Sequence, residues 1–215
     1  DTEPTIFFEY SYDIARLAHA VGIASVYVTN GYMTREMLEL FRGVSDSHDP
    51  WLDAANVDLK AFRDQTYRQV CGARLQPVLD SLKVMKDLGI WVEVTTLVVP
   101  GLNDSDGELS DIARFIANEL GVETPWHVSR FHPDYKMGDR GPTPAATLRR
   151  AYNVGREAGL RYVYVGNLPG AQLEDTLCPN CGRVAIGRRG FRITQRHTRD
   201  GACAECGTVI DGVGI

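Results

Sequence analysis

Four cysteines near the end of the chain have the residue type and the spacing of a metal site. They form two C-x-x-C pairs, each followed by glycine: Cys178, Cys181, Cys203 and Cys206. Two such pairs can place four thiolates tetrahedrally around one Zn²⁺. The stretch between them, residues 183–201, has the pattern of a short β-hairpin. We therefore predict a zinc ribbon, in which the ion is structural because four protein ligands leave no open coordination position.

Other interpretations of this segment stay open. An iron–sulfur cluster also uses four cysteines, but the regular C-x-x-C pairs favour zinc. His197 is an alternative ligand, although four thiolates already suffice. The arginines of the hairpin would suit nucleic acid or an acidic partner, and we favour a solvated surface. Cys71 has no partner in the sequence, and we expect an ordinary buried or loop thiol there.

The rest of the chain alternates between helix-like and strand-like patterns. Apolar residues at helical spacing, or helix-capping residues, predict helices over 5–21, 34–42, 77–88, 103–121 and 143–160. Runs rich in β-branched and aromatic residues predict strands over 25–31, 53–60, 90–101, 125–133 and 161–166. This order is typical of an α/β fold with a parallel sheet, either open or curled into a barrel. In such folds the carboxyl ends of the strands face the ligand site, and most of these predicted strands end in polar or flexible residues.

Composition limits the class of protein. The 215 residues carry a net charge of −5, and 44% of them are hydrophobic, as in an ordinary globular protein. No apolar run reaches the ~18–20 residues that span a bilayer, and no secretory signal is visible. We therefore expect a cytoplasmic protein without a membrane partner. The alternation stops near 167–177, which predicts two domains, residues 1–170 and residues 171–215.

Several motifs in the α/β part resemble a known family. They are TEP at 2–4, VTNGYM at 28–33, NVDLK at 56–60, GARLQPVLDSL at 72–82, TTLVVPGLNDS at 95–105 and WHVSRFHPDYK at 126–136. They resemble the core of radical S-adenosylmethionine (SAM) enzymes, on the branch of the pyruvate formate-lyase activating enzyme. Together with the cysteine-rich tail they resemble the AmmeMemoRadiSam-system radical SAM enzymes. The resemblance covers essentially the whole chain.

The resemblance implies a fold and a set of cofactors. The fold is a (β/α)6 radical SAM barrel, here partial and lacking its first strand or strands, followed by the zinc ribbon. The cofactors are SAM, a [4Fe–4S] cluster and Zn²⁺. In this family a C-x-x-x-C-x-x-C loop holds the cluster and precedes the position of Thr2. The 215 residues contain no such motif, so we expect the cluster ligands upstream of Asp1.

The resemblance also assigns SAM contacts to six residues: Glu3, Thr29, Asn30, Asp58, Lys60 and His132. Glu3 falls on the Glu of the family's Gly-Gly-Glu motif, whose carboxylate faces the SAM ammonium. Lys60 would reach the SAM carboxylate or a ribose hydroxyl, and His132 would contact the ribose or the adenine. The structural alternatives are a helix N-terminal charge for Glu3 and a surface salt bridge between Asp58 and Lys60.

The implied function is hydrogen abstraction by a 5′-deoxyadenosyl radical, with a protein substrate suggested by the activating enzymes. An electron donor such as flavodoxin or ferredoxin would be a partner, and nucleic acid would not. We find no Ser/His/Asp or Cys/His set, so no catalytic side chain is identified. One alternative is a non-catalytic zinc-ribbon module that contacts protein or RNA. A third hypothesis is a metal-free α/β enzyme that uses His132, Asp134 and Lys60.

Overall fold

The computed structural model describes residues 2–42, 51–168, 170–190 and 192–213. It divides the chain into two compact units, Asp1–Thr95 and Thr96–Ile215. A five-stranded sheet has the strand order β1-β2-β3-β4-β5, and its third strand, β3 (Trp91–Val98), crosses the boundary between the units. The prediction of an α/β fold built on a parallel sheet is confirmed.

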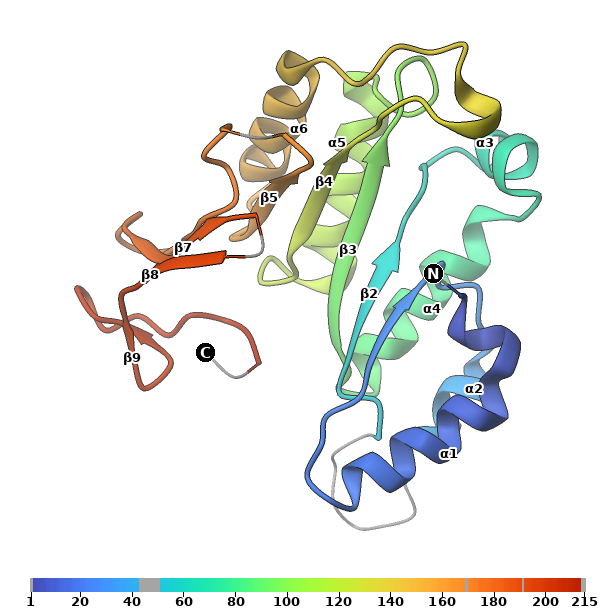
Figure 1. Cartoon of the computed structure of the whole chain (residues 1–215), viewed down its shortest axis with the longest axis horizontal. Helices are drawn as coiled ribbons and strands as arrows, with labels where there is room; N and C mark the ends of the chain where they lie inside the picture. The colour runs from blue at the N-terminus through green and yellow to red at the C-terminus, as the bar shows by residue number, and fades with distance from the viewer. Residues whose placement is uncertain (1, 43–50, 169, 191, 214–215) are drawn as a thin grey trace. The chain divides into compact units, whose positions relative to one another are not determined.

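The first unit begins with a 3-10 turn, Pro4–Phe7, that leads into helix α1. Its other regular elements are α1 (Phe8–His19), β1 (Val26–Thr29), α2 (Arg35–Leu40), β2 (Ala54–Asp58), α3 (Asp64–Thr66), a π-helical turn (Tyr67–Cys71) and α4 (Leu75–Asp87). Strands β1 and β2 run parallel, with Thr29 opposite Val57, so their carboxyl ends lie side by side (Figure 1).

The core of the first unit forms because helices and strands each bury one apolar face. Leu38 of α2, Val57 of β2, and Leu82 and Met85 of α4 are all fully buried. Helix α4 follows the predicted pattern, but it begins at Leu75, so Pro77 lies in its first turn rather than at its first position. The short helix α3 and the π-helical turn after it were not predicted.

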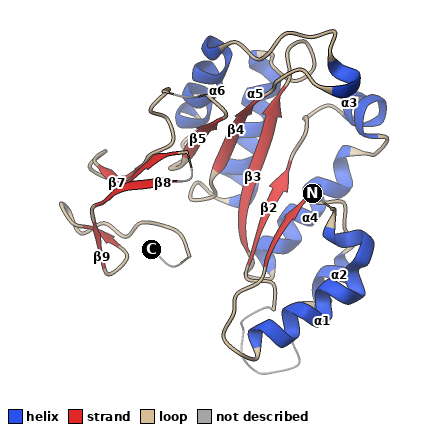
Figure 2. Cartoon of the chain, viewed as in Figure 1, coloured by secondary structure: helices blue, strands red, loops and turns tan. Residues whose placement is uncertain are grey.

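The second unit carries helices on strands and then the cysteine-rich segment. Its elements are α5 (Asp106–Phe115), a π-helical turn (Ile116–Leu120), β4 (Trp126–Arg130), a 3-10 turn (Tyr135–Met137), α6 (Ala145–Glu157), β5 (Val163–Gly166), β6 (Thr176–Leu177), β7 (Val184–Arg189), β8 (Arg192–Arg196), β9 (Thr198–Arg199) and β10 (Ala202–Cys203). Helices α5 and α6 lie together behind β4 and β5 in Figure 2. The predicted hairpin is confirmed, because β7 and β8 pair antiparallel.

The cysteine-rich segment has a small core of its own. Cys178, Ala185, Cys203 and Ile210 are buried together with Tyr162, which precedes β5. The Tyr162 hydroxyl donates to the Asp211 carboxylate over 2.9 Å and accepts from the Asp211 N–H over 3.0 Å. A core of this size stabilises little by itself, which is why such modules depend on a metal. The domain boundary near residue 170 stays a prediction.

Candidate functional site

The carboxylate of Glu3 ties the start of the chain to the end of β1. One of its oxygens accepts hydrogen bonds from the Thr29 hydroxyl (2.6 Å) and from the hydroxyl and N–H of Thr5 (3.0 and 3.3 Å). The other accepts from the backbone N–H (2.8 Å) and the side-chain amide (2.9 Å) of Asn30. The structure therefore brings three of the six predicted contacts, Glu3, Thr29 and Asn30, into one cluster.

Five donors exceed the roughly four lone-pair sites that a carboxylate offers, so Glu3 is fully hydrogen-bonded. Partial burial by itself would raise the pKa of Glu3. The hydrogen bonds from Asn30, Thr29 and Thr5 outweigh that effect and lower the pKa below its ordinary value. The group at the end of β1 is therefore a charged, ordered carboxylate at neutral pH.

Asp58 and Lys60 form a second pair at the end of the neighbouring strand β2. The Lys60 ammonium lies 2.5 Å from the Asp58 carboxylate, and both side chains are about one-third exposed. The Lys60 N–H donates to the hydroxyl of Tyr67 over 3.0 Å. Tyr67 is buried, which raises the pKa of its phenol above the ordinary value. The salt bridge between Asp58 and Lys60, given above as the structural alternative, is therefore present. Tyr67, which was not predicted from the sequence, fixes the backbone of Lys60 by accepting its N–H.

His132 lies in the second unit, in the loop that follows β4. Its side chain is exposed, and its ring Nδ1 lies 3.2 Å from the carbonyl oxygen of Pro133. The place of His132 relative to the residues of the first unit stays a prediction.

The turn Val99–Gly101 follows β3 and is held by two side chains of its own segment. The buried Asn103 accepts from the Val99 N–H (2.7 Å) and donates to the Leu97 carbonyl (2.8 Å). The Asp104 carboxylate accepts from the Gly101 N–H over 2.8 Å.

The predicted helix start at residue 103 is wrong, because Ser105 caps α5 by accepting from the Glu108 N–H.

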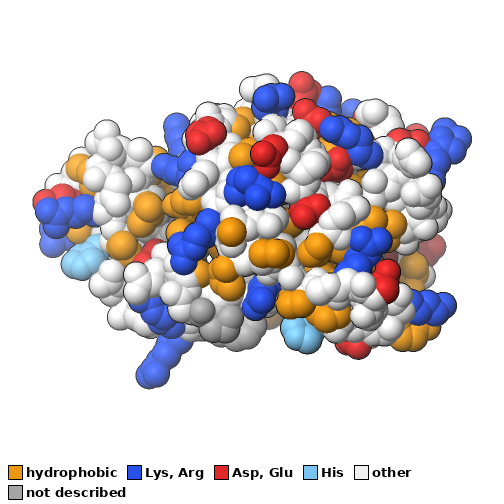
Figure 3. Space-filling view, turned by 90° about the horizontal axis from the view of Figure 1, so that it is seen from above, with side chains coloured by type: hydrophobic (Ala, Val, Ile, Leu, Met, Phe, Trp, Pro, Cys, Tyr) orange, Lys and Arg blue, Asp and Glu red, His pale blue; other side chains and the backbone are white. Residues whose placement is uncertain are grey.

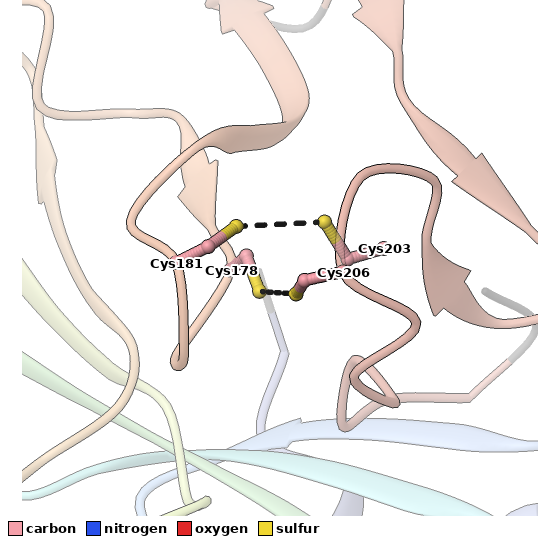
Figure 4. Close-up of side chains that lie close together, drawn as sticks. All are labelled: Cys178, Cys181, Cys203 and Cys206. Carbon is pink, nitrogen blue, oxygen red and sulfur yellow. Dashed lines mark hydrogen bonds between the residues drawn. The ribbon is translucent and has the colours of Figure 1, made fainter.

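The four C-terminal cysteines converge as the sequence predicts (Figure 4). The Sγ atoms of Cys178 and Cys206 lie 3.6 Å apart, those of Cys181 and Cys203 lie 3.8 Å apart, and all four lie within 4.8 Å of one another. A tetrahedral ion with metal–sulfur bonds of ~2.3 Å requires sulfur atoms roughly 3.8 Å apart. The spacing of the four sulfur atoms is therefore close to that of the ligands of a single metal ion.

Electrostatics favours a thiolate at one of these positions. Hydrogen bonding to the Thr208 hydroxyl and backbone lowers the pKa of Cys206 to about 6. Cys71 lies outside the cluster, at the end of the π-helical turn, and is exposed rather than buried or in a loop; desolvation of its thiol by neighbouring atoms raises its pKa.

The surface carries mixed charge. On the face in Figure 3, basic and acidic side chains are interspersed with hydrophobic ones. Among the residues that the structure describes, none of the helices combines the length and the apolar character needed to cross a membrane.

Comparisons with known proteins decide the family. The sequence model of the Radical SAM superfamily matches residues 1–116, more than half of the chain. The chain belongs to the radical SAM superfamily. A protein of Methanocaldococcus jannaschii, described as uncharacterized, is 46% identical over 98% of this chain and 61% of its own length. The pyruvate formate-lyase-activating enzyme of Clostridium pasteurianum is 26% identical over 61% of this chain and 56% of its own length.

A solved structure agrees with this assignment at the level of the fold. A domain of the pyruvate-formate lyase-activating enzyme from Bacteroides vulgatus superposes with a TM-score of 0.64 at 14% identity, covering 78% of this chain and 96% of that one. The predicted resemblance to the activating-enzyme branch of radical SAM enzymes is confirmed. This radical SAM chain spans about 61% and 56% of the lengths of the two relatives named above.

Proposed function

We propose that this chain forms most of an enzyme that uses SAM to generate a 5′-deoxyadenosyl radical, which abstracts a hydrogen atom from a protein substrate. The observation that carries the proposal is the superfamily match over residues 1–116. That stretch includes the cluster at Glu3 and the pair at Asp58. The chemistry that an iron–sulfur cluster supplies in this superfamily is the one-electron reduction that divides SAM into methionine and the radical.

The chain's own residues would hold SAM by charge and hydrogen bonding. Glu3 is the charge complement of the SAM ammonium. Because its oxygens are already occupied, the ammonium must replace a donor, and the exposed side-chain amide of Asn30 is the donor most easily released. Such an exchange keeps the number of hydrogen bonds at Glu3 constant while a neutral donor gives way to a charged one. Lys60, held beside Asp58, would take the SAM carboxylate or a ribose hydroxyl.

We propose zinc for the four-cysteine centre. In a [4Fe–4S] cluster each thiolate binds a different iron atom, which spreads the sulfur atoms farther apart than around one ion. The spacing of 3.6 and 3.8 Å supports a single ion. The ion would be structural, and residues 171–215 would form the ribbon domain around it.

The partners of the reaction are also proposals. The relatives that are named as activating enzymes of pyruvate formate-lyase and benzylsuccinate synthase carry the name of a protein target. This supports a protein substrate here. We further propose a reduced carrier such as flavodoxin or ferredoxin as the electron donor, and the cytoplasm as the compartment.

The test is binding of radiolabelled SAM, measured by equilibrium dialysis under anaerobic conditions. Loss of one charge-assisted hydrogen bond in Glu3→Gln should weaken binding about 10- to 160-fold. The matched control is Glu157→Gln, an exposed carboxylate on α6, which should leave binding unchanged. The reduced enzyme should also release 5′-deoxyadenosine. Equal binding by both variants would contradict the role of Glu3, and absence of 5′-deoxyadenosine would contradict the reaction.

The exposed strand β8 favours a second candidate function, a zinc-ribbon module that binds protein or RNA. All residues of β8 are exposed, and Arg192 lies directly opposite Arg189 of β7. Like charges at directly opposed positions destabilise a strand pair, so an anionic partner would relieve them. Salt-dependent binding of single-stranded RNA or an acidic peptide, lost in Arg192→Glu, would support this candidate.

A further inference from the structure

Strand β8 forms an open edge of the small sheet in the cysteine-rich segment. The strand order in that sheet is β6-β7-β8, so β8 pairs with β7 on one side, and no strand of the described residues pairs with its other side. All five side chains of β8 are exposed, whereas β7 buries Ala185 and Ile186. An edge strand of this kind leaves a row of backbone N–H and C=O groups available to another extended chain.

The arginines around this edge fall into two groups. Arg183 forms an ion pair with Glu205 over 3.2 Å, and the Arg188 guanidinium lies over the ring of Tyr164, 5.6 Å from its centroid. Within the described part of the chain, three further arginines are exposed and form no ion pair and no side-chain hydrogen bond: Arg192, Arg196 and Arg199. Two of these three belong to β8, so the open edge carries positive charge that the described residues do not compensate.

This positive charge decides which extended chain fits the edge. A second copy of β8 would bring arginines close to arginines, and like charges on neighbouring strands destabilise their pairing. Carboxylates at the same positions would stabilise the pairing, because opposite charges across two strands attract. Ile193, which lies between the two arginines in the sequence and is 54% exposed, offers an apolar contact to a β-branched side chain. The edge is therefore protected against self-association and complementary to an acidic strand.

We infer that β8 is a docking edge for an extended acidic segment of a partner protein, which adds a fourth strand to the sheet. This inference rests on the second candidate function, whose partner it names, and it does not depend on SAM binding. Main-chain hydrogen bonds to β8 would hold the segment, and its carboxylates would pair with Arg192 and Arg196. A single-stranded nucleic acid would also pair with the arginines, but its backbone has no N–H groups that could continue the sheet. The open edge therefore favours a peptide.

The register of the hairpin limits the length of the docked segment. The pairing of β7 with β8 skips Thr194, which is thus an extra residue in β8. Such a bulge bends the strand and interrupts its ladder of hydrogen bonds. We therefore expect a short segment whose two acidic residues lie four positions apart, as Arg192 and Arg196 do in β8.

The probe is a synthetic peptide, Glu-Val-Thr-Val-Glu, with blocked ends and a fluorescent label. Its control peptide has the same sequence and charge but carries N-methyl groups on the three central amides, which prevents strand hydrogen bonding. Binding to the full chain is measured by fluorescence anisotropy at low salt. The methylated peptide should bind at least about 10-fold more weakly, because several main-chain hydrogen bonds are lost. Equal binding of the two peptides would overturn the inference, since charge alone would then explain the affinity.

Substitutions in the protein test the contribution of the two arginines. Arg192→Gln/Arg196→Gln should weaken binding of the unmethylated peptide about 2- to 30-fold, as expected for two lost cross-strand charge pairs. The matched control is Arg114→Gln/Arg149→Gln, which also removes two positive charges from exposed positions, on α5 and α6, and should leave the affinity unchanged. If both double variants weaken binding equally, only the net charge of the chain matters and the inference is wrong.

Hydrogen exchange and an RNA probe separate a failure of the inference from a failure of the candidate function on which it rests. The bound peptide should slow exchange of at least one β8 amide about 5-fold or more, and unchanged exchange throughout β8 would contradict docking at this edge. If decauridylate binds through Arg192 and Arg196 but the peptide does not, the second candidate function stands and the acidic-strand inference fails. If neither probe binds, both fail, and the proposal of SAM binding is unaffected.

Discussion

Gly31 follows the Glu3 cluster at the end of β1, and we expect Gly31→Ala to be strongly destabilising. Its backbone has φ +70°, and a Cβ there would lie 2.6 Å from Val57 Cγ1 and 3.3 Å from Val78 Cγ1. The left-handed conformation costs a non-glycine residue about 1–2 kcal/mol. Overpacking against Val57 adds about 1–3 kcal/mol. The free energy of unfolding should therefore fall by about 2–5 kcal/mol, a large share of the ~5–15 kcal/mol typical of a domain.

The two contributions can be separated within the same unit. Gly89 has φ +79° but nothing within 4 Å of its added Cβ. Gly89→Ala should therefore lower the free energy of unfolding only by the cost of the left-handed backbone conformation, about 1–2 kcal/mol. Val57→Ala removes the atom that the new methyl group would meet, so the double variant Gly31→Ala/Val57→Ala should be more stable than the sum of the single effects predicts.

Urea unfolding of the four variants and the wild type measures these quantities. A coupling energy of at least ~1 kcal/mol between positions 31 and 57 would support the close approach of β1 and β2 at this end. Additive effects at positions 31 and 57, or equal costs for Gly31→Ala and Gly89→Ala, would refute the reasoning. In that case the end of β1 would not be packed tightly enough to hold Asn30 against Glu3.

Three further predictions concern the candidate site. The pKa of Glu3 is lowered from 4.5, so the hydrogen bonds of its carboxylate stabilise the fold fully above pH 4.5. This stabilisation is lost as the pH falls through the lower pKa of the folded state. In urea unfolding at a series of acidic pH values, Glu3→Gln should remove this loss of the free energy of unfolding. Cys178→Ser should abolish the one zinc per chain found by metal analysis and expose residues 176–213 to protease, whereas Cys71→Ser should do neither. Asn103→Ala should leave two backbone groups unpaired and cost about 2–6 kcal/mol in urea unfolding, whereas Asp104→Ala, which removes a hydrogen bond to an exposed N–H, should cost less than about 1 kcal/mol.

Much of the fold could be predicted because its signals are local. Strand β3 and helix α4 were predicted from β-branched content and helical spacing, and both exist with shifted ends. The four cysteines carry their own spacing signal, so their convergence could be predicted without knowledge of the rest of the fold. These features depend on residues close together in the sequence, where propensity and periodicity suffice.

The errors occur where the same residue types serve two purposes. Asn, Asp and Ser cap helices, and they also hold tight turns by bonding to backbone groups. In the run Asn103–Ser105 all three types are adjacent, and the sequence alone does not show which one begins the helix. The structure assigns Ser105 to the cap and the two residues before it to the turn. The path of the chain after β3 decides between these roles, and that path depends on distant partners such as Thr143.

Glu3 shows how the structure changes the chemistry that a motif implies. The family resemblance places a carboxylate opposite the SAM ammonium, which suggests a carboxylate that has no hydrogen-bond partner until SAM binds. The structure shows the carboxylate already bound by Thr29, Asn30 and Thr5. In the role proposed for Glu3, SAM binding would be an exchange of donors rather than the neutralisation of an isolated charge, and its net free energy would be smaller than that of a new ion pair. The hydrogen bonds from Thr29, Thr5 and the Asn30 backbone hold the Glu3 carboxylate in place, so in this exchange only the Asn30 side chain has to move, which limits the cost of reorganisation.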